Sequence, residues 1–291
     1  MIQSPDLHSH STASDGTLVP EALVRRARAA GVEVLALTDH DTLEGLAEAQ
    51  RAADVVGLTL VPGVEISVSW GGRTVHVVGL HIDPTHQGLR AGLARLLEYR
   101  AWRAEEIGRR LAKYGIAGAY EGARALSNGR LIGRTHFARF LVTRGVASDL
   151  RDVFNRFLVS GKPGHVVGEW ATLEEATRWI RESGGQAVIA HPARYKLTRT
   201  RLLHLIGAFR ECGGVGLEVV SGSHGRDEML AFGVLAREQR LLASAGSDYH
   251  GPENPWIELG RLPALPAGCT PIWHTWPAQA PQPPLARAAV G

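Results

Sequence analysis

Short apolar segments alternate with amphipathic stretches along most of the chain. Brief apolar runs are typical of buried strands, whereas apolar positions three and four residues apart are typical of helices. We predict strands in a short segment before Asp6 and in 32–41, 58–69, 73–82, 186–192, 216–221 and 241–251. We predict helices in the stretches 18–31, 42–57, 174–185, 202–214 and 227–240.

The succession of strand and helix indicates an α/β fold. Pro20 near the start of the first helical stretch and Gly31 at its end are residues that helices prefer at those positions. Strands that alternate with helices and are joined by tight glycine turns build βα units and a parallel sheet. Because six or seven such strands follow one another, we predict a barrel, or a nearly closed one, rather than an open sheet.

Residues 87–172 interrupt this succession. The segment is rich in arginine and mainly helical in pattern, and no part of it has a good strand pattern. We interpret it as a helical insertion that caps one face of the sheet, which leaves 1–86 and 173–270 for the barrel domain. Proline and alanine are abundant in 271–291, which predicts an irregular tail.

Composition narrows the class of protein. With 44% hydrophobic and 21% charged residues among 291, the chain can bury a large core, which excludes disorder throughout. A net charge of +3 is too small to indicate duplex DNA or a membrane surface as a partner. Cys212 and Cys269 are too few for a disulfide scaffold and fit a reducing compartment. We find no signal-peptide pattern and no apolar run of membrane-spanning length, so we expect a cytoplasmic protein.

Histidine and carboxylate residues gather where the predicted strands end. His8 and His10 are two residues apart in an extended segment, so both can reach one ion, and Asp248 and His250 repeat that spacing. The full set of candidates is His8, His10, Asp15, His40, Glu65, His76, His191, Asp248 and His250. All except His76 lie at or near a strand end, and strand ends on one side of a parallel barrel converge on one site. We therefore expect a single pocket.

These nitrogen and oxygen donors predict a metal centre. Such ligands suit Zn, Mn or Fe rather than the soft-metal clusters that thiolates bind. A catalytic zinc ion typically keeps about three protein ligands, so the set implies two or three divalent ions. Any one strand histidine is more often a hydrogen-bonded core residue, and Asp15 alone could form a turn. The coincidence of separate features at one sheet edge favours a metal centre over these structural roles, and over a metal-binding module without turnover.

The sequence also resembles a known family. The segments HSHSTASDGT, LALTDHDT, PGVEIS, AVIAHPARY and SAGSDYHGP are similar to those of the polymerase-and-histidinol-phosphatase (PHP) superfamily of trinuclear phosphoesterases. Within the insertion, LIGRTHFARFLV and FLVSGKPG resemble the stand-alone bacterial members that act on 3′,5′-nucleoside bisphosphates, a group that includes the 5′-to-3′ exoribonuclease RNase AM. The resemblance implies a distorted (β/α)7 barrel, in agreement with the predicted strands.

The resemblance further implies how the ligands divide among the ions. One ion is held by His8, His10, Glu65 and Asp248, a second by Glu65, His76 and His191, and a third by Asp15, His40 and His250. Some relatives have histidine where Asp15 stands, so the resemblance leaves the identity of the metal undecided. Manganese is our first expectation, with zinc or iron as alternatives. Two ions about 3.5–4 Å apart lower the pKa of a shared water for attack on phosphorus. We expect Asp248 to orient that water and His191 to be needed for turnover. Protonation of the leaving group stays unassigned: a metal-bound water or His224 could serve, and the alternative for His224 is a structural role in its loop.

Substrate choice is expected to reside in the insertion. Arg100 and Arg103 are three residues apart, so they share a helix face and could clamp a phosphate. The resemblance places Arg134 where a cap residue would meet the metals, and a tryptophan could stack on a base. A packed tryptophan or a solvated cation is the structural alternative in each case. The candidate substrate contacts are Arg134, Arg100, Arg103, Trp102, His136 and Lys162.

The predicted function is a metal-dependent phosphomonoesterase that removes the 3′-phosphate of a nucleoside 3′,5′-bisphosphate such as adenosine 3′,5′-bisphosphate. The alternatives are a 5′-to-3′ exoribonuclease on short RNA and a histidinol-phosphate phosphatase. A closed, arginine-lined cap favours a mononucleotide, whereas an open basic groove with aromatic platforms favours an oligonucleotide. A PHP-like module that assists a polymerase is a further alternative, which would need a partner because the chain has no polymerase-sized remainder.

Overall fold

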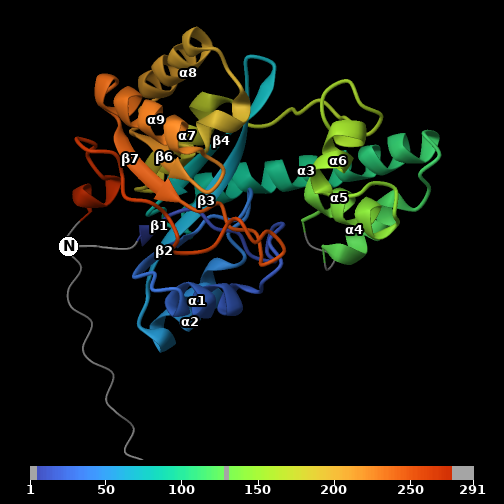
Figure 1. Ribbon diagram of the computed structural model, residues 1–291, viewed down its shortest axis with the longest axis horizontal. Coiled ribbons are helices and arrows are strands. Elements are labelled where there is room, and N and C mark those ends of the chain that lie inside the picture. The colour runs from blue at the N-terminus through green and yellow to red at the C-terminus, as the bar shows by residue number, and fades with distance from the viewer. Residues whose placement is uncertain (1–4, 128–130, 277–291) are drawn as a thin grey trace, which may run out of the picture.

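Seven strands form one sheet that curves into a nearly closed barrel in the computed structural model, which describes residues 5–127 and 131–276 (Figure 1). The strands are β1 (Pro5–Asp6), β2 (Val34–Leu37), β3 (Thr59–Trp70), β4 (Arg73–Leu80), β5 (Gln186–Ile189), β6 (Gly216–Ser221) and β7 (Leu242–Gly246). They pair in the order in which they occur along the chain. Each coincides with a segment in which the apolar pattern predicts a strand, so the predicted α/β barrel is confirmed.

The sheet is mixed, and the prediction of a parallel sheet is wrong at β4. This strand is antiparallel to both β3 and β5, while the other neighbouring pairs are parallel. Only Gly71 and Gly72 separate β3 from β4, and both have positive φ angles, 53° and 76°. A two-residue turn of this kind makes a hairpin, whereas a parallel connection needs roughly a dozen residues or more.

Hydrogen bonds between the two ends of the sheet close the barrel. Just beyond β1, Leu7 N donates to Ala245 O of β7 at 2.9 Å. Further along, Asp248 N donates to His8 O at 2.8 Å. The segments that carry His8 and Asp248 therefore lie side by side at the mouth of the barrel, although 240 positions separate them in the sequence.

Helices α1 (Pro20–Ala29), α2 (Leu46–Val56), α7 (Leu173–Glu182), α8 (Arg199–Glu211) and α9 (Arg226–Glu238) cover the outside of the sheet (Figure 1). Side chains along β2 alternate between two apolar clusters, as the two-residue period of a strand requires. Val34 and Ala36 belong to the cluster inside the barrel, whereas Leu35 and Leu37 belong to the larger cluster between strands and helices. The barrel interior is thus a packed core rather than a channel.

The chain beyond β7 returns to the barrel. Ile272, in the 3-10 helix η3 (Ile272–Thr275), is fully buried in the interior cluster. Ala243 N of β7 donates to Thr270 O at 2.8 Å, which docks this segment on the sheet. The predicted irregular tail therefore begins with residues that pack on the barrel, and 277–291 lie outside the described residues.

Between β4 and α7 the chain forms α3 (Gln87–Lys113), α4 (Ala119–Leu126), α5 (Arg134–Thr143), α6 (Leu150–Val153) and the π-helix η1 (Phe154–Leu158). The long helix α3 extends from the barrel into this group of helices (Figure 1). Its residues Leu89 and Leu96 pack in the main core, whereas Ile107 and Leu111 belong to a separate apolar cluster spanning 104–166, which we call the cap. None of the helices described, α3 included, has the length and apolar character needed to cross a membrane.

Candidate metal centre and anion pocket

Four buried side chains converge where the two ends of the sheet meet. The Nε2 atoms of His8 and His10 each lie 3.3 Å from Glu65 Oε2. The same two atoms lie 3.5 and 3.2 Å from Asp248 Oδ1. All four residues are at most 5% exposed. Two imidazoles and two carboxylates in this arrangement have the donor chemistry that suits a divalent cation.

A second group of donors shares His10 with the first. His10, Asp15, His40 and His250 place one donor atom each within 4.8 Å of one another. Asp15 Oδ1 lies 3.2 Å from His250 Nε2 and 3.8 Å from His40 Nε2. Thr135 of α5 donates its Oγ1 hydrogen to Asp15 Oδ2 at 2.8 Å. The cap therefore contacts this group directly.

Glu65 connects these groups to the remaining histidines. Its Oε1 lies 2.8 Å from both His76 Nδ1 and His191 Nε2, and its Oε2 lies 2.9 Å from His40 Nδ1. His40, Glu65 and His76 form a third group of donors within 4.8 Å. The structure thus brings together all of the histidines and carboxylates that we singled out as metal ligands, with Glu65 at the centre.

Glu65 lies in the middle of β3, not at the strand end predicted for it. Only Thr59–Pro62 of β3 pair with β2, and beyond them β3 continues past the end of β2 as a hairpin with β4. A single parallel bridge joins His40, in the loop after β2, to Glu65. Glu65 reaches the rim of the barrel because its neighbour β2 ends before it, and His76 reaches the same level from mid-strand in β4, as predicted.

The polar atoms at the centre are poorly satisfied by the protein alone. Burial by itself would raise the pKa of Glu65, but the imidazoles of His76, His40 and His8 hold it well below its ordinary value. Burial lowers the pKa of His40 to about 4. Several buried atoms lack a hydrogen-bond partner: His8 Nε2, His10 Nε2, Asp15 Oδ1, His40 Nδ1, Glu65 Oε2 and Asp248 Oδ1. Because such atoms are rare in folded proteins, the donor set fits divalent cations that would bind them.

Glu218 of β6 forms hydrogen bonds with two of these histidines on the side away from the centre. Its Oε1 lies 2.9 Å from His8 Nδ1, which leaves His8 Nε2 facing the centre. Its Oε2 accepts the backbone N–H of His191. A carboxylate on the remote ring nitrogen fixes the orientation and tautomer of a metal-binding histidine. Glu218 was not among the predicted residues, although a carboxylate inside the apolar strand GLEVVS was a visible signal.

Three residues of the site have left-handed backbone. The φ angles are 51° at Asp41, 25° at His191 and 57° at Asp248. For residues other than glycine this conformation costs on the order of 1–3 kcal/mol. The surrounding hydrogen bonds, including that from Asp248 N to His8 O, hold the backbone in this form, and the side chains of His191 and Asp248 extend toward the other donors of the site.

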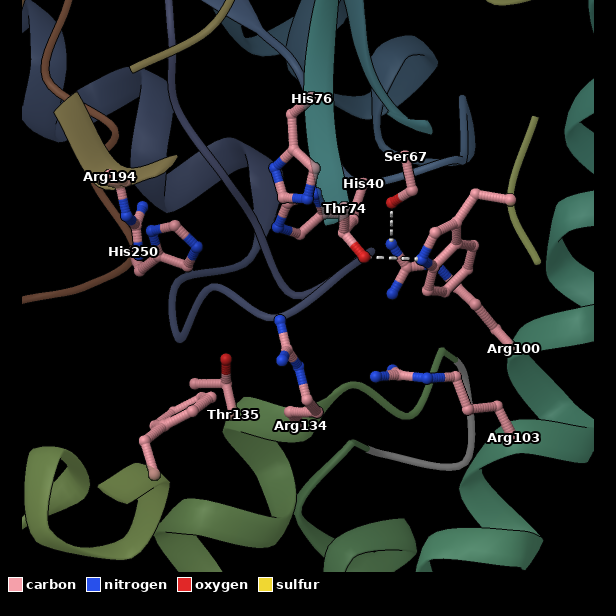
Figure 2. A pocket seen from close by; sticks show the side chains of 12 residues that line it. His40, Ser67, Thr74, His76, Arg100, Arg103, Arg134, Thr135, Arg194 and His250 are labelled. Atoms are coloured by element: carbon pink, nitrogen blue, oxygen red, sulfur yellow. Dashed lines mark hydrogen bonds between the residues drawn. The ribbon is translucent and has the colours of Figure 1, made fainter. Parts of the chain in front are cut away.

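Four arginines surround a cavity of about 120 Å³ beside the imidazoles of His40, His76 and His250 (Figure 2). The arginines are Arg100, Arg103, Arg134 and Arg194. Figure 2 shows Arg134 extending from the cap toward the imidazoles of the barrel. Arg194, which was not predicted, comes from the 3-10 helix η2 (Pro192–Tyr195) directly after His191.

Two of these arginines are paired with carboxylates and two are not. Arg100 Nε donates to Asp41 Oδ2 at 2.6 Å, and Arg194 donates to Asp248 Oδ2. Arg103 and Arg134 form no ion pair with any residue that the structure describes. Burial, together with the neighbouring arginines, lowers the pKa of Arg103 to about 9 and that of Arg134 to about 10. Both remain cationic at pH 7, so the pocket carries positive charge that no carboxylate of the described residues neutralises, and this favours a bound anion.

The other predicted substrate contacts do not line this pocket. His136 is buried in α5, where its Nδ1 accepts a backbone N–H at 3.0 Å and caps the helix. Trp102 is 54% exposed on α3. Lys162 is exposed beyond η1. Thr135 and Arg194 occupy the positions beside the metal-type donors instead.

Comparison with known proteins agrees with this geometry. The family model of the PHP domain matches residues 6–166. The chain is 49% identical over 270 residues to the 3′,5′-nucleoside bisphosphate phosphatase of Chromobacterium violaceum, covering 92% of this chain and 95% of that protein. It is 48% identical to the 5′-3′ exoribonuclease Rnm of Escherichia coli, over 93% of each chain. A solved structure of an amidohydrolase from Chromobacterium violaceum, with bound sulfate and no metal, is similar with a TM-score of 0.90 and 48% identity, covering 94% of this chain and 95% of that one. The chain therefore belongs to the PHP domain family.

Proposed function

We propose that this protein is a metal-dependent phosphomonoesterase that hydrolyses the 3′-phosphate of nucleoside 3′,5′-bisphosphates, such as adenosine 3′,5′-bisphosphate, to a 5′-nucleotide and phosphate. The observation that carries the proposal is a cluster of histidine and carboxylate donors beside a pocket with two arginines that form no ion pair, the buried Arg103 and the half-buried Arg134. A substrate with two phosphates can place one phosphate at the donor cluster and the other at these arginines. The identity of 49% to a phosphatase named for this substrate supports the same class.

The metal ligands proposed for this activity fall into three sets. These are His8, His10, Glu65 and Asp248; Glu65, His76 and His191; and Asp15, His40 and His250. The first set is one of the groups whose donor atoms lie within 4.8 Å of one another, and Asp15, His40 and His250 lie together in another group, which also includes His10. His76 groups with Glu65 and His40, and His191 Nε2 lies 2.8 Å from Glu65 Oε1. We favour manganese, with zinc or iron as alternatives, because imidazole and carboxylate ligands suit all three. Bound ions of this kind lower the pKa of water and neutralise charge on phosphoryl oxygens.

Side chains of the protein would position the substrate against that centre. Arg103 and Arg134 would bind the 5′-phosphate through charge-assisted hydrogen bonds. Arg194 lies between Asp248 and the cavity, so it would contact the 3′-phosphate during transfer. Asp248 would orient the attacking water. The leaving 3′-oxygen takes up a proton, for which His224 is not placed, because its Nδ1 faces a backbone carbonyl at 3.1 Å and it does not line the cavity.

A substrate screen on metal-stripped protein tests the proposal. The protein is reloaded with Mn, Zn, Fe or Mg and assayed for phosphate release from adenosine 3′,5′-bisphosphate, 3′-AMP, 5′-AMP and histidinol phosphate. We expect kcat/KM for the bisphosphate to exceed that for each monophosphate by at least about tenfold, since only it engages both sites. A preference for histidinol phosphate would contradict the substrate class, and equal activity in stripped protein would contradict the metal requirement.

Hydrolysis of short RNA from the 5′ end is a second candidate. The 48% identity to an exoribonuclease and an open groove beside the pocket favour it. In both reactions the bond that breaks joins phosphorus to the 3′-oxygen of a nucleotide whose 5′-phosphate is bound. One site can therefore serve both substrates.

A further inference from the structure

An open groove of about 780 Å³ leads away from the anion pocket, between the cap and the loop that follows β7. The groove and the pocket share Thr135, Phe154, Arg194 and His250, so they are continuous. Asp248 also lines the groove. In the proposed complex the nucleoside lies between its two phosphates, so a bisphosphate has no group beyond the 3′-phosphate with which to occupy this space.

The wall of the groove carries exposed apolar surface. Trp256 is 91% exposed and Leu150 is 38% exposed, and they line the groove together with Phe154 and Ile257. Within the loop after β7, Trp256 N donates a hydrogen bond to Asn254 Oδ1 at 3.3 Å. An exposed apolar patch in a concave site marks a binding surface, and the face of a tryptophan stacks on any nucleobase.

Two arginines of the cap line the same groove, Arg139 of α5 and Arg151 of α6. Neither forms an ion pair within the described residues. Two carboxylates at the groove are engaged elsewhere, since Asp149 caps the N-terminus of α6 and Glu253 accepts a hydrogen bond from Thr17 Oγ1 at 2.9 Å. Cationic side chains beside an exposed aromatic ring are the pattern with which proteins bind single-stranded nucleic acid.

We propose that this groove binds the nucleotides downstream of the scissile phosphate in 5′-phosphorylated RNA, with a base stacked on Trp256 and a phosphate near Arg139. The inference rests on the proposed function, because it places the 5′-terminal nucleotide in the arginine pocket. Water adds to phosphorus, the bond from phosphorus to the 3′-oxygen breaks, and that oxygen takes a proton. The products are a 5′-nucleotide and an RNA one residue shorter, on which the phosphorus remains as a 5′-phosphate.

That new 5′-phosphate is the group that Arg103 and Arg134 bind. Each shortened RNA is therefore the substrate of the next round, and the chain is removed stepwise from its 5′ end. A bisphosphate leaves the groove empty and is hydrolysed once. An RNA occupies the groove and is shortened repeatedly.

The substitution Trp256→Ala tests the groove. We measure kcat/KM for adenosine 3′,5′-bisphosphate and for a 5′-phosphorylated tetraribonucleotide, and the affinity for the same RNA by fluorescence anisotropy with chelator present. We expect kcat/KM and affinity for the RNA to fall about tenfold, because one stacked base is lost, while the bisphosphate reaction is unchanged. Trp256→Phe, which keeps an aromatic face, should retain most of the RNA activity, and Arg139→Ala should weaken RNA binding without affecting the bisphosphate.

Matched controls come from outside the groove. Tyr114→Ala removes another exposed aromatic ring of the cap, and Arg144→Ala removes another arginine, at the end of α5. Both should resemble wild type on both substrates. Equal losses on the two substrates, no change in Trp256→Ala, or a wild-type protein inactive on RNA would overturn the groove assignment. A wild-type protein inactive on the bisphosphate would overturn the proposed function instead.

Discussion

Arg100 of α3 and Asp41 of the loop after β2 form a buried ion pair that joins the helix leading to the cap to the barrel. Arg100 Nε donates to Asp41 Oδ2 at 2.6 Å, and Arg100 Nη2 donates to Ser67 Oγ at 2.9 Å. Asp41 Oδ1 accepts the backbone N–H of Ser67 at 2.7 Å. The guanidinium also lies 4.9 Å from the ring of Trp170. The same contacts therefore hold α3 in place and build one wall of the anion pocket.

Arg100→Leu should lower the free energy of unfolding by about 3 kcal/mol, because it leaves the Asp41 carboxylate buried without a partner. Urea denaturation measures this change. The control is Arg25→Leu, since Arg25 and Glu21 form an exposed pair with side chains 52% accessible, for which we expect less than about 1 kcal/mol. Similar changes in the two variants would show that the buried pair does not stabilise this junction.

Glu218→Gln should weaken metal binding by about 10–100-fold, because the carboxylate orients His8 and fixes its tautomer. Titration of stripped protein with Mn²⁺ against a competing chelator measures the affinity. The fold should persist, since glutamine has nearly the same shape and can still accept the His191 N–H. Glu238→Gln on α9, at a half-exposed carboxylate, is the control. An unchanged affinity in Glu218→Gln would mean that other contacts orient His8.

Arg134→Gln should raise KM for adenosine 3′,5′-bisphosphate by about 10–100-fold, the cost of losing a hydrogen bond between charged groups. KM for an aryl phosphate, which has no second phosphate, should change little. Steady-state kinetics on both substrates measure the difference, and Arg144→Gln, at the C-cap of the same helix, serves as the control. An equal rise on both substrates would remove Arg134 from recognition of the 5′-phosphate.

His191→Ala and Asp248→Asn should each lower kcat by at least about a hundredfold, because each removes a donor from the proposed metal centre. Circular dichroism of the variants should match that of wild type. His204→Ala, at an exposed position on α8, is the control and should keep full activity. Activity near wild type in either variant would refute the proposed mechanism.

Stability of the metal-free protein should fall as the pH rises above 6.5. Burial by itself would lower the pKa of His10, but the carboxylates of Asp248 and Glu65, 3.2 and 3.3 Å from its Nε2, raise it from 6.5 to about 10. The folded state thus keeps a proton that the unfolded state loses, so this stabilisation is complete below pH 6.5 and is lost as the pH approaches 10. Denaturation of stripped protein across this range measures it. His10→Gln should make the profile less steep, and the slope that remains belongs to His8, whose pKa, although burial opposes the shift, is raised well above 6.5 by Glu218, Glu65 and Asp248. A flat profile in the wild type would contradict the assignment.

Much of the candidate site could be predicted from the sequence because its donors lie in recognisable local patterns. His8 with His10, and Asp248 with His250, have the spacing of one face of an extended chain, and the second pair follows the apolar run LLASAG. Glu65 and His76 each stand out as an ionisable residue between apolar neighbours in a predicted strand segment, although the position of Glu65 within its strand was predicted wrongly. The apolar pattern of a strand indicates that the segment is buried. It does not indicate where the neighbouring strand ends.

The tertiary structure alone decided how these segments face one another. Glu218 lies beside His8 Nδ1 because the fold brings together two residues that are 210 positions apart in the sequence. Thr135 and Trp256 lie beside the site only because the cap and the loop after β7 fold over the barrel mouth. Local sequence determines which segments form strands or helices, through the period of their apolar side chains. It also determines which side chains can act as metal ligands, through their chemistry. Contacts between distant segments depend on strand register and packing, which the order of residues encodes only through the whole fold.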